Sequence, residues 1–397
     1  MTQVWLFELL KGAGKIFLHP LFYYCFLAAA YLGVTRVKRE RKNFHVRAEN
    51  AYFELKQLLP AGLAIGFFLS IISVAAGLAV PFEAIILTGI LTVLFSFAMN
   101  PRFLSPALTL GLAICILAVI ALNGTGLEWI DRYFTVIEDQ AYTALAVLLG
   151  LLLIGEGLLI SRNGSKSTSP KLVKSKRGQT VGVHEAQRIW ILPMFLLVPG
   201  NALEPMFGWW PVFSIGEELF SLILVPFGIG FRQQISGMLP KEAVRMHGGR
   251  VLALGLLVLG ISIAGYWYPL AALAAVAAAI IGRLLISAWL RKKDANLPSY
   301  FAKQNDRVMI LGVVPGSPAA KMGLQVGEVV QKVNGSSVND ESSFYEAIQR
   351  NAAHCKLEVL DVKGQVRYVQ RALYEGDHHQ LGILFVQDEK KWDSAVV

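Results

Sequence analysis

Long apolar stretches dominate roughly the first three quarters of the chain, and polar residues interrupt them only at intervals. A helix needs about 20 mostly apolar residues to cross the hydrocarbon core of a bilayer. Nine stretches predict such spans: residues 16–35, 58–80, 84–98, 104–122 and 141–161, two within 189–231, then 251–268 and 270–290. We divide 189–231 into two helices because prolines, glycines and the turn at 208–211 interrupt it. The sequence therefore predicts a polytopic α-helical membrane domain at 16–293, after an N-terminal interfacial segment at 1–15.

Lys and Arg cluster in alternate loops between these predicted spans. Residues 36–42 read RVKRERK, and the loops 162–188 and 232–250 and the segment 291–293 are also basic. The loop between the fourth and fifth spans is instead acidic, with Glu128, Asp131, Glu138 and Asp139. Because basic residues concentrate in cytoplasmic loops, the pattern predicts an extracytoplasmic N-terminus and a cytoplasmic C-terminal region. The polar loop 162–188 shows no periodicity and is expected to be flexible.

The composition agrees with a membrane protein. Of the 397 residues, 54% are hydrophobic and only 16% are charged, whereas a soluble domain has about 25% charged residues. The net charge is +9. Because the basic residues lie beside apolar spans, we attribute them to topology and to contact with the lipid bilayer, and we expect no nucleic acid. Cys25, Cys115 and Cys355 form neither a metal-binding spacing nor a disulfide framework.

After a linker at 294–306, the apolar runs shorten to the length of β-strands. Residues 308–314, 328–333, 356–362, 365–373 and 381–386 read as strands, and helices are expected to begin at Ser317 and Ser342. The segments GSPA at 316–319, GL at 323–324, GE at 327–328 and NG at 334–335 follow one another as in a PDZ domain, and the region resembles that family. The resemblance implies a small α+β PDZ-like domain at 307–388 that binds peptides, followed by a tail at 389–397.

The carboxylate-binding loop of PDZ domains normally precedes these strands, whereas its match here, Leu381-Gly382-Ile383, follows them. This order resembles circularly permuted bacterial PDZ domains. In such a domain an extended peptide adds to a strand edge beside a helix, and backbone N–H groups bind its carboxylate. The resulting candidates for peptide binding are Leu381, Gly382, Ile383, Phe385, Phe344 and Ile348. In the alternative interpretation the apolar residues fill the domain core and the glycine marks a β-bulge.

The sequence contains no complete catalytic signature. The string nearest to the zinc-protease motif, HEAQR at 184–188, lacks the second histidine, and no phosphate-binding glycine loop occurs. His378 and His379 are neighbours in an expected loop, which predicts solvated side chains rather than metal ligands. We therefore predict no enzyme activity, no cofactor and no metal site.

Several ionisable residues lie within the apolar stretches, where a charge is costly and frequently functional. They are His19, Glu156, Glu204, Glu217, Glu218 and Arg283. A role in transport or proton relay would use such groups. We favour the alternative that they reach the membrane interface or pair with one another inside the bundle.

The whole chain resembles a known family of membrane proteins. The segments ELLK at 8–11, FLHPLFY at 17–23 and RVKRERKNFHVR at 36–47 precede several spans and the terminal PDZ-like domain. This order resembles the MinJ family of cell-division topology proteins from rod-shaped Gram-positive bacteria. The resemblance implies an adaptor, enriched at septum and poles, that links a DivIVA-like scaffold to a MinD-like ATPase and other division proteins and so prevents misplaced septa. The alternative is a regulatory subunit of a membrane protease or a peptide-sensing transporter.

Overall fold

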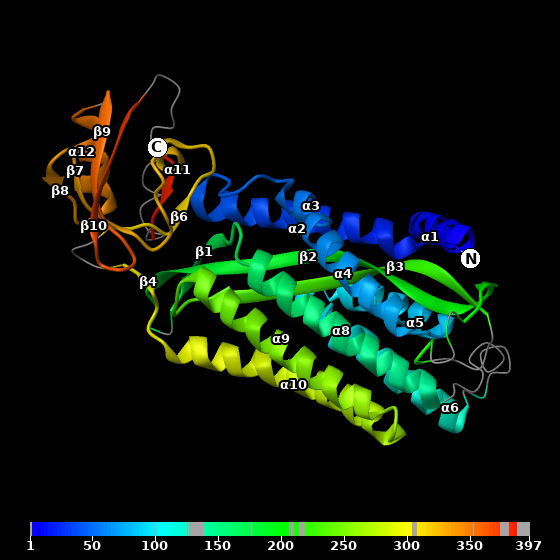
Figure 1. Cartoon of the computed structure of the whole chain (residues 1–397). Coiled ribbons are helices and arrows are strands. Elements are labelled where there is room, and N and C mark those ends of the chain that lie inside the picture. Colours follow the sequence, from blue (N-terminus) through cyan, green and yellow to red (C-terminus); the bar gives the residue numbers. More distant parts are fainter. Residues whose placement is uncertain are drawn as a thin grey trace.

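The computed structural model describes residues 2–98, 100–124, 126, 139–175, 177–205, 207, 210–213, 219–303, 308–351, 353–373 and 381–386. Long helices run side by side around a β-hairpin, and a small β-rich domain lies at one end of this bundle (Figure 1). Some residues singled out in the sequence lie outside the described residues, namely Glu128, Asp131, Glu138, Glu217, Glu218, His378, His379 and the tail 389–397.

Six helices among the described residues are long and apolar enough to cross a membrane. They are α2 (Pro20–Phe44), the joined segments α3 (Phe53–Gln57) and α4 (Pro60–Ala76), α6 (Pro106–Asn123), α8 (Asp139–Asn163), α9 (Pro240–Ala264) and α10 (Pro269–Asn296). Shorter elements are α1 (Thr2–Lys15), η1 (Ile16–Leu18), the apolar helix α5 (Phe82–Phe97) and η2 (Pro101–Phe103). These helices confirm the prediction of a polytopic α-helical membrane domain.

Helix α8 forms the centre of the bundle. Its most apolar window is 89% buried, whereas the corresponding windows of the other five long helices are 28% to 50% buried. Helices α2, α4, α6, α9 and α10 each begin with a proline. The first helical position suits proline because its N–H would have no partner inside the helix.

The two helices predicted within 189–231 are wrong. The chain there forms an antiparallel hairpin of β2 (Thr180–Leu203) and β3 (Phe220–Ile235). Pro193 of β2 lies opposite Pro226 of β3. In a helix interior each proline would remove a hydrogen bond and cost about 3 kcal/mol, whereas a strand tolerates proline where its nitrogen faces an edge.

The hairpin lies in an apolar interior, where each backbone polar group needs a partner. Along one edge of β2, the N–H of Ile191 donates to Leu58 O at 2.9 Å and that of Phe195 donates to Ser70 Oγ at 2.8 Å. Pro193 lies between these two positions on the same edge and has no N–H to satisfy. The junction of α3 and α4 and helix α4 itself therefore supply the partners that a further strand would otherwise provide.

Helix α4 approaches β2 closely because of two glycines. A Cβ at Gly62 would collide with the carbonyl oxygen of Ile191, and one at Gly66 would collide with that of Pro193. Small residues on a helix face let two backbones approach each other inside a membrane. The edge of β2 is thereby covered along α4.

Two antiparallel strands, β2 and β3, take the place of the two predicted helices, so the number of passes along the bundle stays the same. The C-terminal end of α2 contacts the PDZ-like domain, and the end of α10 leads into it (Figure 1). The basic segments 36–42 and 291–293 therefore lie at the same end of the bundle.

The prediction that the loop 162–188 is flexible is also wrong for much of its described length. There β1 (Ser169–Lys174) pairs with the first residues of β2, with Ser169 opposite Glu185. Arg39 of α2 donates to Ser169 Oγ at 3.1 Å and forms an ion pair with Glu185. Arg232 also donates to Glu185 Oε1, at 2.5 Å. Glu185, which lies within the stretch expected to be flexible, therefore joins β2 to α2 and β3.

The C-terminal domain has the α+β composition expected from the sequence. Its larger sheet contains β5 (Val308–Met309), β7 (Val329–Val333), β8 (Ser336–Ser337), β9 (His354–Leu360) and β10 (Val366–Ala372). A second pair joins β6 (Gly312–Val313) to β11 (Ile383–Leu384), and the helices are α11 (Pro318–Lys321) and α12 (Glu341–Gln349). Within the predicted linker, β4 (Phe301–Ala302) pairs with β2 of the membrane domain.

Candidate peptide-binding groove

Strand β11 pairs with β6 along one edge, and no other described strand pairs with it. The carbonyl of Gly382 accepts from Val314 N and that of Leu384 accepts from Leu311 N, both at 2.8 Å. Both carbonyls therefore face β6. Because successive residues of a strand direct their backbone groups to opposite edges, the N–H and C=O of Ile383 face away from β6. A peptide that pairs with this edge would extend the sheet by one strand.

The turn before β11 has a left-handed backbone. Leu381 and Gly382 have φ values of 53° and 75°, a region that favours glycine. The carbonyl of Leu381 accepts from Ala319 N at 3.0 Å, which joins the turn to the start of α11. A Cβ on Gly382 would lie 2.6 Å from Ser317 Oγ. Both the dihedral angle and the space at this position therefore require glycine.

Helix α12 lies opposite β11. A capping box fixes its start, because Ser343 N donates to Asp340 Oδ1 at 2.8 Å and Asp340 N donates to Ser343 Oγ at 3.1 Å. Phe344 and Ile348 lie one turn apart on the buried face of the helix. The ring of Phe344 meets that of Phe385 edge to face, with centroids 5.0 Å apart. This contact joins α12 to the chain that continues from β11.

The structure brings the candidate residues together in one cluster. Phe344, Ile348, Leu381, Ile383 and Phe385 are at most 6% exposed and pack with apolar residues of β7 and β9. Their side chains thus fill the domain core, as the alternative interpretation expects. Their role in peptide binding stays a prediction, and it requires a peptide to use the backbone edge of Ile383 or to separate the two phenylalanine rings.

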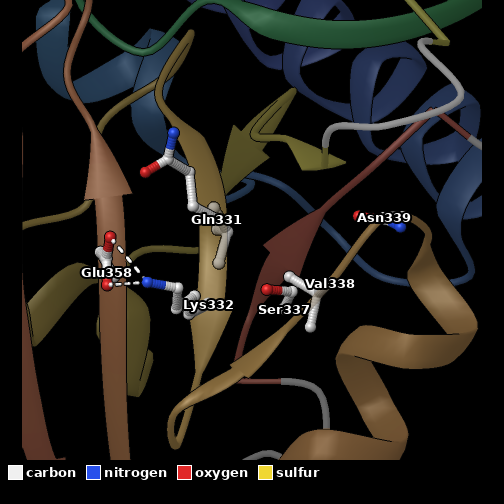
Figure 2. Close-up of a pocket in the computed structure, with 7 residues that line it drawn as sticks. Gln331, Lys332, Ser337, Val338, Asn339 and Glu358 are labelled. Carbon is white, nitrogen blue, oxygen red and sulfur yellow. Dashed lines mark hydrogen bonds and ion pairs between the residues drawn. The ribbon is translucent and has the colours of Figure 1, made fainter.

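A hollow of about 290 Å³ lies elsewhere on the domain, beside β7, β8 and β9 (Figure 2). Its lining residues are Val330, Gln331, Lys332, Ser337, Val338, Asn339 and Glu358. Lys332 Nζ pairs with Glu358 Oε2 at 3.1 Å between the neighbouring strands β7 and β9, and such a solvent-exposed ion pair contributes little free energy. The lining includes none of the predicted peptide-binding residues.

Cys355 is the cysteine of the PDZ-like domain. Its side chain is fully buried in the core, and burial raises the pKa of its thiol to about 11. A thiol in that state is a poor nucleophile at neutral pH. Within the described ranges, no three His, Cys, Asp or Glu side chains converge as metal ligands.

The face of β11 that points away from the core of the PDZ-like domain packs on the membrane domain. Leu384 and Leu311 are 6% and 0% exposed, and they share an apolar cluster with Phe44 of α2, Leu172 of β1 and Phe301 of β4. Complete burial of one such side chain is worth about 1.5–3 kcal/mol. An apolar interface therefore joins the PDZ-like domain to the end of the bundle.

His184 of β2 joins the two domains by hydrogen bonds. Its Nε2 lies 2.9 Å from Leu311 O, and its Nδ1 lies 2.9 Å from Thr168 Oγ1. Burial lowers the pKa of His184 to about 4, so the ring is neutral at physiological pH. Nε2 then donates to the carbonyl and Nδ1 accepts from the hydroxyl. This residue of the incomplete HEAQR motif therefore has a structural role.

Glu156 and Arg283 form a buried ion pair between α8 and α10. Arg283 donates to Glu156 Oε1 from Nη2 at 2.8 Å and from Nε at 3.0 Å, and Ser105 Oγ donates to Oε2 at 2.7 Å. Arg283 Nη1 also lies 2.5 Å from Ser287 Oγ and 3.3 Å from His247 Nε2. For these two residues the structure confirms the interpretation that the charges pair inside the bundle.

The other two ionisable residues of the apolar stretches that the structure describes are His19 and Glu204. His19 Nδ1 accepts from Leu21 N at 3.3 Å and so caps the start of α2. Glu204 follows the last residue of β2 and is exposed. Neither arrangement resembles a proton relay.

Sequence reasoning missed the interface between the two domains. Residues 308–314 and 381–386 are almost unbroken apolar runs, apart from one glycine each. A strand with one exposed face alternates polar and apolar residues, whereas an unbroken run indicates that both faces are covered. This signal could have identified Leu311 and Leu384 as contact residues.

Comparison with known proteins gives similarity at two scales. A model of the PDZ domain matches residues 309–361. Over 406 aligned residues, the chain is 41% identical to the cell division topological determinant MinJ of Bacillus subtilis, covering 100% of this chain and 99% of the relative. It is 26% identical over 370 residues to the probable cell division topological determinant MinJ of Lacticaseibacillus paracasei, covering 90% and 93% of the two chains.

A third relative is similar over one domain only. The chain is 31% identical over 71 residues to the mitochondrial serine protease HTRA2 of Drosophila ananassae, which is 18% of this chain and 16% of the relative. That match is confined to the PDZ region and does not extend to a protease domain. No solved structure matches the chain.

Proposed function

The chain belongs to the MinJ family of cell-division topological determinants, and from this membership we propose that it is a membrane-anchored adaptor in division-site selection. The observation that carries the proposal is similarity along the entire chain, membrane domain and PDZ domain together, to a relative named for that role. The apolar helices supply an anchor, and a PDZ domain supplies a protein-binding module. A recruiting function uses both parts without catalysis.

In this proposal the PDZ domain faces the cytoplasm. Basic segments at 36–42 and 291–293 lie at the end of the bundle that carries it, and basic residues favour the cytoplasmic side of a membrane. We assign residues 16–293 to the membrane domain and 307–388 to the permuted PDZ-like domain. The linker 294–306 contributes β4 to the sheet of the membrane domain.

The proposed partners are a DivIVA-like scaffold, a MinD-like ATPase and other division proteins. An adaptor between such partners would be enriched at septa and poles and would restrict septum formation to midcell. These partners rest on family membership, since no residue pattern of this chain identifies them.

A fluorescent fusion expressed at native level in a rod-shaped Gram-positive host tests the proposal. Enrichment of the fusion at septa and poles, and misplaced septa after deletion of the chain, are the expected results. A uniform membrane label with normal septum placement would contradict the adaptor role. It would favour the second candidate, a PDZ-bearing regulatory subunit of a membrane protease or a peptide-sensing transporter. The short match with a serine protease is the observation that favours the protease subunit.

The groove itself needs a separate test because its candidate residues are buried. We propose that Ile383 pairs with an extended peptide and that the turn at Leu381 and Gly382 binds its terminal carboxylate. The purified full-length protein in micelles is titrated with fluorescent peptides that end in apolar residues, as free acids and as C-terminal amides. The free acids are expected to bind more tightly, because an amide lacks the negative charge that backbone N–H groups favour. Equal binding of the two forms would remove the carboxylate loop from the proposal.

A further inference from the structure

Trp289, near the end of α10, has two cations against its ring. The Cζ atom of Arg250 on α9 lies 3.6 Å from the ring centroid, and Nζ of Lys293 lies 5.3 Å from it. Both distances are within the roughly 6 Å range of cation–π attraction. Trp289 is 43% exposed. Two positive charges are thus held together at an accessible site between α9 and α10.

Among the residues that the structure describes, no carboxylate lies within ion-pair distance of Arg250 or Lys293. Asp294 follows Lys293 in sequence but accepts from the backbone N–H groups of Ser236 and Gly237, at 2.9 Å each. Cation–π attraction does not neutralise charge. The site therefore keeps two positive charges that no described acidic side chain offsets.

The site lies where the apolar surface of α10 gives way to charged residues. Leu284 and Leu285 are 49% and 62% exposed on the preceding turns, and Arg291 and Lys292 follow Trp289. Tryptophan concentrates at the level of lipid headgroups. A tryptophan at that level would place the two cations at the depth of lipid phosphates, in the leaflet on the side of the PDZ domain.

We propose that Arg250, Trp289 and Lys293 form a binding site for the headgroup of an anionic phospholipid. The two cations bind the phosphate oxygens, and the exposed indole packs against the glycerol and the first methylene groups. Basic pockets between membrane helices bind anionic headgroups by this chemistry. The site differs from a general attraction of basic loops to the membrane, because two side chains from two helices are positioned on one ring.

A matched pair of double variants tests the site. Arg250→Gln with Lys293→Gln removes both cations from the ring. Arg245→Gln with Lys292→Gln removes the same charge from exposed positions on the same two helices. Thermal unfolding of the full-length protein in neutral detergent is followed while phosphatidylglycerol or phosphatidylcholine is added.

Phosphatidylglycerol is expected to stabilise the wild type and the control variant at similar concentrations. The site variant should need about 100-fold more lipid, because each of the two charge-assisted hydrogen bonds to the phosphate contributes a factor of about ten. If the response to phosphatidylglycerol weakens equally in both double variants, general charge attraction explains the effect and the proposed site is refuted. Equal stabilisation by soluble glycerol phosphate would overturn the assignment to a lipid.

Trp289→Leu provides a second route if the glutamine variant does not fold. It leaves the net charge unchanged but removes the ring that positions Arg250 and Lys293. The response to phosphatidylglycerol should weaken, while phosphatidylcholine should act as on the wild type. An unchanged response to phosphatidylglycerol in this variant rejects the proposal.

Discussion

The buried pair of Glu156 and Arg283 makes a quantitative prediction about the stability of the membrane domain. The side chains of the two residues are 0% and 3% exposed. Among the described residues, replacing Arg283 with Met leaves the Glu156 carboxylate with only the Ser105 hydroxyl as a partner. Replacing Glu156 with Leu leaves the guanidinium, within the part of the chain that the structure describes, with only Ser287 and His247 as partners. Each single change should lower the free energy of unfolding by about 3–5 kcal/mol, because it leaves an uncompensated buried charge.

The double variant Glu156→Leu with Arg283→Met should be more stable than either single variant. Removing both charges avoids the uncompensated ion, and replacing a buried pair by apolar residues of similar volume is often nearly neutral. The remaining polar groups have local substitutes, since the Ser287 hydroxyl can bond to the carbonyl four residues earlier in α10. We expect a net loss of about 2 kcal/mol or less for the double variant.

Unfolding by sodium dodecyl sulfate in mixed micelles, followed by far-UV circular dichroism, measures these differences. Glu204→Gln serves as a control at an exposed carboxylate and should change the unfolding free energy by no more than about 0.5 kcal/mol. If the double variant loses as much stability as the two single variants together, the side chains act independently. The interpretation of Glu156 and Arg283 as one electrostatic unit would then be wrong.

Three further predictions concern the PDZ-like domain and its contact with the bundle. Leu384→Ala should lower the free energy of unfolding by about 2–5 kcal/mol and make the chain near 297–303 accessible to limited proteolysis. Ile383 lies on the same strand but faces the domain core, so Ile383→Ala should lower the melting temperature of the domain without that cleavage. Gly382→Ala should lower the melting temperature, because the left-handed backbone costs about 1–2 kcal/mol for alanine and the new Cβ meets Ser317; unchanged melting would refute the strained turn. Acidification should weaken the contact through His184, since its pKa is about 4 when buried against 6.5 when exposed. The unfolded chain binds the proton first, so the free energy of unfolding falls by up to about 3 kcal/mol as the pH falls from 6.5 to 4. In chemical denaturation, His184→Asn should flatten that pH dependence.

The membrane helices could be predicted because their signal is local. A stretch of about 20 apolar residues is long enough to cross a bilayer wherever it lies in the chain. The predicted spans 104–122 and 141–161 correspond to α6 (Pro106–Asn123) and α8 (Asp139–Asn163). The predicted span 251–268 is too short at the end of the bundle that carries the PDZ-like domain, because α9 begins at Pro240. Its first turns are polar, so hydropathy does not detect them.

The hairpin was missed because hydropathy does not distinguish a buried strand from a buried helix. Both read as continuous apolar runs, and only the length of the run, the flanking residues and the β-branched content separate them. Pro193 and Pro226 were the available signal, since each would break a helix. The positions of their partners could not be read from the sequence. Gly62 and Gly66 of α4 lie more than a hundred residues before the strand whose edge they cover.

The PDZ-like domain shows a different limit of sequence reasoning. Its strand segments and the helix that carries Phe344 and Ile348 follow from local pattern and family resemblance. The apolar run at 381–386 further implied a covered second face, because Leu384 stands where a solvated strand would carry a polar residue. That pattern shows that a contact exists but does not identify the surface that makes it. The contact residues Phe44, Leu172 and Phe301 come from three separate elements, and only the three-dimensional course of the membrane domain brings them to one place.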